Sequence, residues 1–196
     1  MPGFYDEIGE QPDALRRTID GLAGQIAALT EWRMRLEMGG LKRIIFSGMG
    51  ASHAANLPAQ LRLLHGGIEA FVIDSSELLY NQLPLVTPET MLVLISQSGR
   101  SVETVRLIDV LNERAPILAI TNNAESPLAH HAETTLLMQA GVEATVSSKT
   151  YTCTLATQHL LATALTGGDT DAALRDLYAA ADAMERVLPL YREGAA

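Results

Sequence analysis

Cysteine, aromatic and basic residues are all scarce in this chain of 196 residues. A single cysteine, Cys153, excludes an intramolecular disulfide, and no cluster of cysteine and histidine has the spacing of a zinc site, so we expect no metal. Fourteen basic residues against 23 acidic ones leave a net charge of −9, which argues against a nucleic-acid surface. No apolar run reaches membrane length and no basic segment leads into an apolar one, so we expect a cytoplasmic protein without a membrane partner.

Short apolar runs alternate with helical patterns along most of the chain. Such alternation predicts β-α units in a parallel sheet with both faces covered by helices. We therefore predict an α/β fold, a three-layer αβα sandwich around a five-stranded parallel sheet, of the flavodoxin-like kind. The predicted strands are 43–46, 70–73, 91–95, 116–120 and 134–138, and the predicted helices among and after them are 53–64, 75–80, 102–111, 151–165 and 172–190.

Leucines recur every seven residues from Leu15 to Leu36, which predicts an amphipathic helix before the first strand. Two interpretations are open: the helix covers one face of the domain, or it reaches to a second copy or a second domain. We place the limits of the organisation at 1–40 for this N-terminal helical segment, 41–168 for the α/β domain, and 169–196 for a C-terminal helix that is a candidate linker to a second domain.

The most informative stretch is the turn that begins at Ser96, between an apolar strand and a helical pattern. A strand-to-helix turn directs free backbone N–H groups and the positive end of the helix dipole at one spot, where a phosphate can bind. Ser96, Ser98 and Ser101 add three hydroxyls, and Gln97 adds an amide. Gly99 lets a ligand approach the backbone. A helix N-cap alone needs only one hydroxyl, so the turn predicts phosphate binding.

A second glycine- and serine-containing loop begins at Gly48, after the first predicted strand. It lacks the third glycine of a dinucleotide fingerprint, because His53 stands there, so no nucleotide cofactor is expected. Asp74, which ends the next strand, is better explained as an N-cap in a capping box with Glu77. Open parallel sheets bind ligands beyond the carboxyl ends of their strands, where the strand order reverses, and both loops are expected there.

Several stretches resemble, in order, the motifs of one known family. They are Glu-Ile-Gly-Glu-Gln-Pro at 7–12, Gly-Ala-Ser at 50–52, Ser-Glu-Leu-Leu-Tyr at 76–80, Ser-Gln-Ser-Gly at 96–99, Ala-Gly-Val-Glu at 140–143 and Val-Ser-Ser-Lys-Thr-Tyr-Thr at 146–152. The chain thereby resembles the sugar isomerase (SIS) domain, in particular the first SIS domain of the isomerase module of glucosamine-fructose-6-phosphate aminotransferase and its phosphosugar isomerase relatives. Ala51, Arg100 and Ser101 depart from the family pattern.

The resemblance implies a sugar-phosphate site. The residues implied around the phosphate are Ser52, Ser96, Gln97, Ser98 and Ser101, and those implied on the sugar side are Gly50, Ala51, Gly99, Ser147 and Ser148. It also implies a phosphosugar isomerase or amino-sugar isomerase/deaminase that acts on a hexose 6-phosphate or hexosamine 6-phosphate, needs no cofactor, and is active only when paired with a second copy, as in a homodimer, or with a second SIS domain.

Aldose–ketose isomerisation needs a carboxylate or similar base to move a proton between adjacent carbons. In two-domain relatives the base glutamate, a lysine and a ring-opening histidine come from the second domain. Here the weak candidates are Glu77, Glu143, His53 and His65, each with a structural alternative such as helix capping for Glu77. The catalytic residues therefore stay unknown at this stage, and a non-catalytic sugar-phosphate sensor or binding module remains the alternative function.

Overall fold

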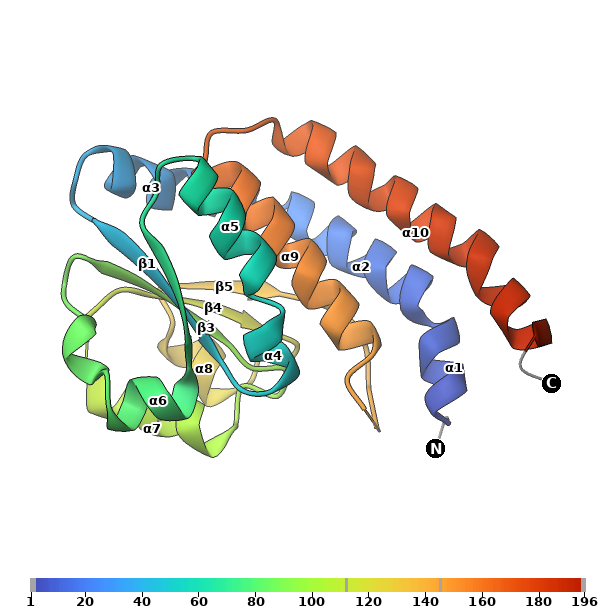
Figure 1. The fold of residues 1–196 in the computed structure, drawn as a ribbon, viewed down its shortest axis with the longest axis horizontal. Helices are drawn as coiled ribbons and strands as arrows, with labels where there is room; N and C mark the ends of the chain where they lie inside the picture. Colours follow the sequence, from blue (N-terminus) through green and yellow to red (C-terminus); the bar gives the residue numbers. More distant parts are fainter. Residues whose placement is uncertain (1–2, 112, 145, 195–196) are drawn as a thin grey trace.

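Five parallel strands form a single sheet in the computed structural model, which describes residues 3–111, 113–144 and 146–194 (Figure 1). The strands are β1 (Arg43–Gly48), β2 (Ala70–Asp74), β3 (Thr90–Ile95), β4 (Ile117–Thr121) and β5 (Thr134–Leu137). Their order is β2-β1-β3-β4-β5, and every pairing is parallel. The predicted five-stranded parallel sheet is confirmed, and its strand order reverses between β1 and β3.

Helices cover both faces of the sheet (Figure 1). They are α1 (Phe4–Gly9), α2 (Gln11–Ala23), α3 (Ile26–Glu37), α4 (Ala51–Ala54), α5 (Leu57–His65), α6 (Ser75–Tyr80), the 3₁₀ turn η1 (Leu83–Leu85), α7 (Val102–Leu111), α8 (Pro127–His131), α9 (Lys149–Leu165) and α10 (Thr170–Gly194). Alternate strand residues bury against α2, α3, α5 and α9 on one face and against α6, α7 and α8 on the other. Helix α10 packs outside this sandwich on α2 and α9.

The leucine repeat of the N-terminal segment lies inside the chain's own core. Leu15, Leu22 and Leu29 are each almost fully buried against other parts of the same chain. The repeat therefore covers a face of this domain, and the alternative that these leucines reach another copy is wrong. The predicted continuous helix is also wrong, because the chain breaks into α2 and α3 after Gly24, a residue type that weakens a helix interior.

The predicted helix 53–64 is likewise two helices, α4 and α5. Pro58 in the first turn of α5 has no N–H to donate, so the hydrogen-bond ladder of α4 cannot continue through it. Helix α5 ends at His65 and is followed by Gly67 with a φ of 77°, as a glycine C-terminus requires.

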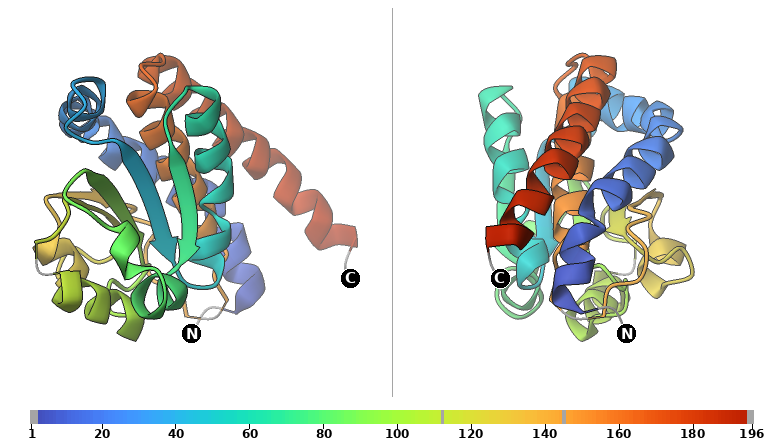
Figure 2. Two further views of the ribbon diagram at one scale, coloured as in Figure 1. Left: turned by 60° about the vertical axis from the view of Figure 1, so that its left-hand side comes forward. Right: turned by 90° about the vertical axis from the view of Figure 1, so that its right-hand side faces the viewer.

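The N-terminal helices and α10 run side by side along α9 (Figure 2). The first two residues of the segment 1–40 and the last two of 169–196 lie outside the described residues, and our division into these segments stays a prediction. Among the helices of the described part, none combines the length and apolar character needed to cross a membrane.

Cys153 is fully buried in α9, and this burial raises the pKa of its thiol from 9.0 to about 11. Between these values the unfolded chain has lost the thiol proton and the folded chain has kept it, so the free energy of unfolding falls as the pH rises. The wild type should therefore lose up to about 3 kcal/mol from pH 9 to pH 11 that Cys153→Ala does not lose. Urea unfolding of both proteins across this range measures it, and parallel pH profiles would contradict it.

Candidate phosphate-binding site

Two loops start side by side where the strand order reverses. Gly48 at the end of β1 pairs with Ile95 at the end of β3, so the loops that follow them leave the same edge of the sheet. A Cβ added at Gly48 would lie 3.0 Å from the Ile95 carbonyl oxygen and 3.0 Å from the Ser52 Cβ. Only a glycine allows this approach, which brings Ser52 against the start of the second loop.

The second loop gathers its serines at the N-terminus of α7. Ser96 is buried, and its Oγ accepts a hydrogen bond from the Gly99 N–H at 3.2 Å and lies 3.3 Å from the Ser101 Oγ. The Ser98 Oγ accepts from the Arg100 N–H at 3.2 Å, and Ser98 is exposed. The structure thus brings Ser96, Ser98 and Ser101 together beside the positive end of a ten-residue helix.

Residues after β4 hold this loop from the other side. The Gln97 carbonyl accepts from the Asn122 N–H at 3.0 Å and from the Thr121 hydroxyl at 3.3 Å. The sequence argument missed Thr121 and Asn122, although polar residues that directly follow a buried strand on the ligand-binding edge could have pointed to them.

Gly99 packs against the start of α8. It has a φ of 62°, and its carbonyl accepts from the Leu128 N–H at 3.4 Å. Ser126 caps α8 through the Ala129 N–H at 3.2 Å, as the Ser126-Pro127 pair predicts, and it fills the space that a side chain at Gly99 would need.

The residues implied on the sugar side lie in two places. Gly50, with a φ of 53°, and Ala51 are exposed where α4 begins, next to Ser52. Ser147 is exposed, with its Oγ 2.9 Å from the Thr150 Oγ1, and Ser148 is buried at the start of α9. The segment 139–148 that contains this second pair is the connection between β5 and α9.

One asparagine ties this connection to the phosphate loop. The Asn122 Nδ2 donates to the Gly141 carbonyl at 2.7 Å, and its Oδ1 accepts from the Ala140 N–H at 2.8 Å. Because the Asn122 N–H also bonds Gln97, a single residue links the two parts of the candidate site.

Glu143 is occupied by the helix that follows it. Its carboxylate accepts from the Ser148 N–H at 2.8 Å, the Ser148 hydroxyl at 3.0 Å and the Thr150 N–H at 3.3 Å, and also from the Thr150 hydroxyl. These bonds satisfy donors at the N-terminus of α9, which otherwise have no partner in the helix. Glu143 therefore acts as a helix cap in this structure.

The other candidates for proton transfer lie apart. Glu77 is exposed and accepts from the Asn81 Nδ2 at 3.0 Å, so its predicted bond back to Asp74 is wrong, because the side chain turns toward the next helical turn. Asp74 does cap α6, through the Ser76 N–H at 2.9 Å. His53 directly follows Ser52, and its buried Nδ1 has no hydrogen-bond partner among the described residues. His65 lies at the opposite edge of the sheet, where α5 leads into β2.

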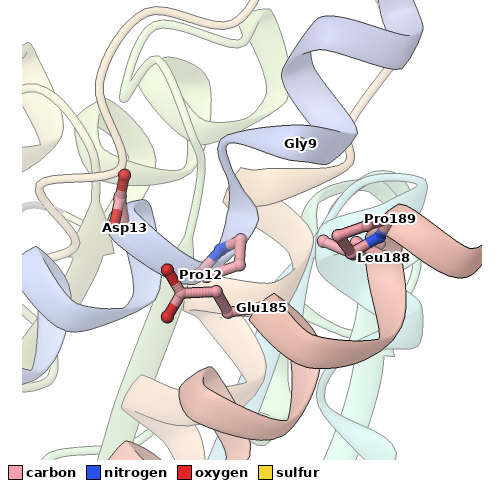
Figure 3. A pocket seen from close by; sticks show the side chains of 6 residues that line it. All are labelled: Gly9, Pro12, Asp13, Glu185, Leu188 and Pro189. Carbon is pink, nitrogen blue, oxygen red and sulfur yellow. The ribbon is translucent and has the colours of Figure 1, made fainter. Parts of the chain in front are cut away.

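Within the described residues, no three histidine, cysteine, aspartate or glutamate side chains form a group that could hold a metal ion. Away from the loops, a hollow lies between the turn from α1 to α2 and the C-terminal part of α10 (Figure 3). Its lining residues are Gly9, Pro12, Asp13, Glu185, Leu188 and Pro189. These six include two carboxylates and no basic or hydroxyl group, so the hollow would repel an anion.

A parallel sheet with two hydroxyl-bearing loops at its switch point defines an α/β domain suited to an anionic ligand. Residues 40–164 match the SIS domain, and the chain belongs to this family. This match confirms the resemblance seen in the sequence.

Relatives and solved structures are consistent with that family. An isomerizing glutamine–fructose-6-phosphate aminotransferase of Pyrococcus horikoshii is 33% identical over 159 residues, which are 80% of this chain and 26% of the relative. The arabinose 5-phosphate isomerase KpsF of Escherichia coli is 35% identical over 127 residues, 59% of this chain and 39% of KpsF. The chain thus spans 26% and 39% of these relatives' lengths. The structure of Escherichia coli CFT073 c3406 in complex with a sugar phosphate superposes with a TM-score of 0.68 at 19% identity and covers 82% of this chain and 86% of that one.

Proposed function

We propose that this domain binds a sugar phosphate, with the phosphate held by Ser52 and by the loop from Ser96 to Ser101. The observation that carries the proposal is the meeting of both loops at the switch point, with the hydroxyls of Ser96 and Ser101 at the N-terminus of α7. A dianion there would receive hydroxyl and backbone donors and the field of the helix dipole. The sugar-phosphate complex of a protein with the same fold supports this class of ligand.

We further propose that the domain belongs to a phosphosugar or amino-sugar isomerase that is completed by a second copy of the chain or by a second SIS domain. Both relatives described above carry names of enzymes that act on sugar phosphates. Helix α10 is the proposed connection to a second domain. Since Glu143 is engaged in capping α9 and Glu77 bonds Asn81, the base would come from outside the described residues. The same engagement favours a second candidate function, a sugar-phosphate sensor without turnover.

Binding is tested by thermal-shift titration with fructose 6-phosphate, glucosamine 6-phosphate and inorganic phosphate. A ligand at 100 times its dissociation constant should stabilise the fold by about 2.7 kcal/mol. Ser98→Ala removes one hydroxyl donor to a charged group, which is worth about 1.5–3 kcal/mol, so all three ligands should bind about 10- to 100-fold more weakly.

Ser76→Ala is the matched control. Ser76 begins α6 on the same edge of the sheet, but its hydroxyl faces the Met49 sulfur at 3.6 Å, so its removal should leave the three affinities unchanged. Equal losses in both variants, or no shift of the wild type with any ligand, would contradict the phosphate site. An NMR assay of fructose 6-phosphate then separates the two functions, since an isomerase forms an aldose product and a sensor does not.

A further inference from the structure

The segment at the start of the chain contacts the candidate site through two acidic residues. Glu7 in α1 is fully buried, and its Oε1 accepts from the Ala144 N–H at 2.5 Å. Glu10, at the N-cap of α2, forms an ion pair with Lys149, which is 2% exposed. Both contacts join helices of the first dozen residues to the connection between β5 and α9 (Figure 2).

The beginning of the same connection is also held by α2. The Arg17 guanidinium donates to the Gln139 and Ala140 carbonyls, each at 3.4 Å. On its inner side the connection is bonded to Asn122, whose N–H in turn bonds the phosphate loop at Gln97. The connection is therefore fixed between two supports, the phosphate loop on one side and α1 and α2 on the other.

These outer contacts are more than the local fold requires. Ala144 is exposed, so water could satisfy its N–H, yet a fully buried carboxylate does so. A buried carboxylate and a buried ammonium are unfavourable unless each is paired, so each contact holds its partner at a defined place. The result is a fixed position for Ser147 and Ser148, which lie between the two anchored residues, Ala144 and Lys149.

We propose that Glu7 and Glu10 are positioning residues for the sugar side of the site. They hold the connection at the separation from the phosphate loop at which Ser147 and Ser148 meet the hydroxyl groups of the bound sugar, and they do not touch the ligand. This proposal rests on the proposed function. The phosphate loop has its own supports in Thr121, Asn122 and the start of α7, so the two glutamates act on the sugar half of the ligand only.

Calorimetric titration with fructose 6-phosphate and with inorganic phosphate tests the proposal. Glu10→Gln removes the charge that faces Lys149, and Glu7→Met keeps the length of the side chain without its acceptor. Both variants should bind fructose 6-phosphate about tenfold more weakly, the equivalent of one hydrogen bond, and should bind inorganic phosphate as the wild type does. In amide hydrogen exchange, residues 146–150 should exchange faster while 96–101 keep their protection.

Arg16→Gln is the structural control, because Arg16 joins α2 to Asp182 and Glu185 of α10 and, within the described part of the chain, has no bond to the connection. It should leave both affinities unchanged. If Glu10→Gln does not fold, Glu10→Gln/Lys149→Met takes its place, since it leaves no unpaired buried ammonium. Equal loss of both ligands, or unchanged binding of both, overturns the positioning role alone. A wild type that binds neither ligand overturns the proposed function, and the positioning role with it.

Discussion

Gly99→Ala is expected to abolish detectable sugar-phosphate binding and to lower the free energy of unfolding by about 2–5 kcal/mol. Gly99 has a φ of 62°, where an alanine side chain costs about 1–2 kcal/mol. The added Cβ would also lie less than 3.0 Å from the Ser126 Cβ and Oγ, a separation that Cβ atoms essentially never show. Relief requires the loop to move away from α8, which displaces the donors of Ser98 and Ser101. Urea unfolding and thermal-shift titration measure the two effects.

Gly39→Ala separates backbone strain from the steric conflict. Gly39 has a φ of 75°, yet a Cβ added there meets no atom of the described residues within 4 Å, and Gly39 lies in the turn after α3, away from the site. The control should lose only the cost of the backbone conformation, about 1–2 kcal/mol, and should bind the ligand normally. Equal destabilisation by the two substitutions would show that Ser126 yields easily and that Gly99 is not needed for the shape of the loop.

The sheet and the position of both loops could be predicted from the sequence because they depend on local pattern. Buried parallel strands are short apolar runs, and the turn after each strand of such a sheet lies at a known edge. The pairing of Gly48 with Ile95 then follows from the topology alone. Helix breaks were harder, since Gly24 and Pro58 lie inside continuous apolar patterns that suggest a single helix.

Long-range partners of polar residues could not be predicted in the same way. Glu143 has the composition of a possible base, but its role depends on where the chain turns into α9, which periodicity does not specify. The same is true of Glu10 and Lys149, which are 139 positions apart in the sequence and form an ion pair only in the folded chain. Neither pair has a spacing that marks it, so only the structure identifies the partners.

Glu143→Ala is expected to lower the free energy of unfolding by about 3–5 kcal/mol. Loss of the helix cap accounts for about 1–2 kcal/mol, and the loss of two hydroxyl bonds to a charged acceptor accounts for most of the rest. Ser148 and Thr150 are buried, so water does not readily replace the carboxylate as their partner. Urea unfolding at pH 7 measures the change, and amide hydrogen exchange should show the first turn of α9 opening.

Glu143→Gln distinguishes a helix cap from a catalytic base. The amide oxygen of glutamine still accepts from the Ser148 N–H, and the Thr150 hydroxyl can rotate to accept from the amide NH₂, so this variant should lose no more than about 1–2 kcal/mol. A cap retains ligand binding and any turnover in Glu143→Gln, because the shape at the start of α9 is kept. A base retains stability but loses turnover, because an amide cannot accept the proton. A stable, ligand-binding and inactive Glu143→Gln would therefore return Glu143 to the chemistry of the site.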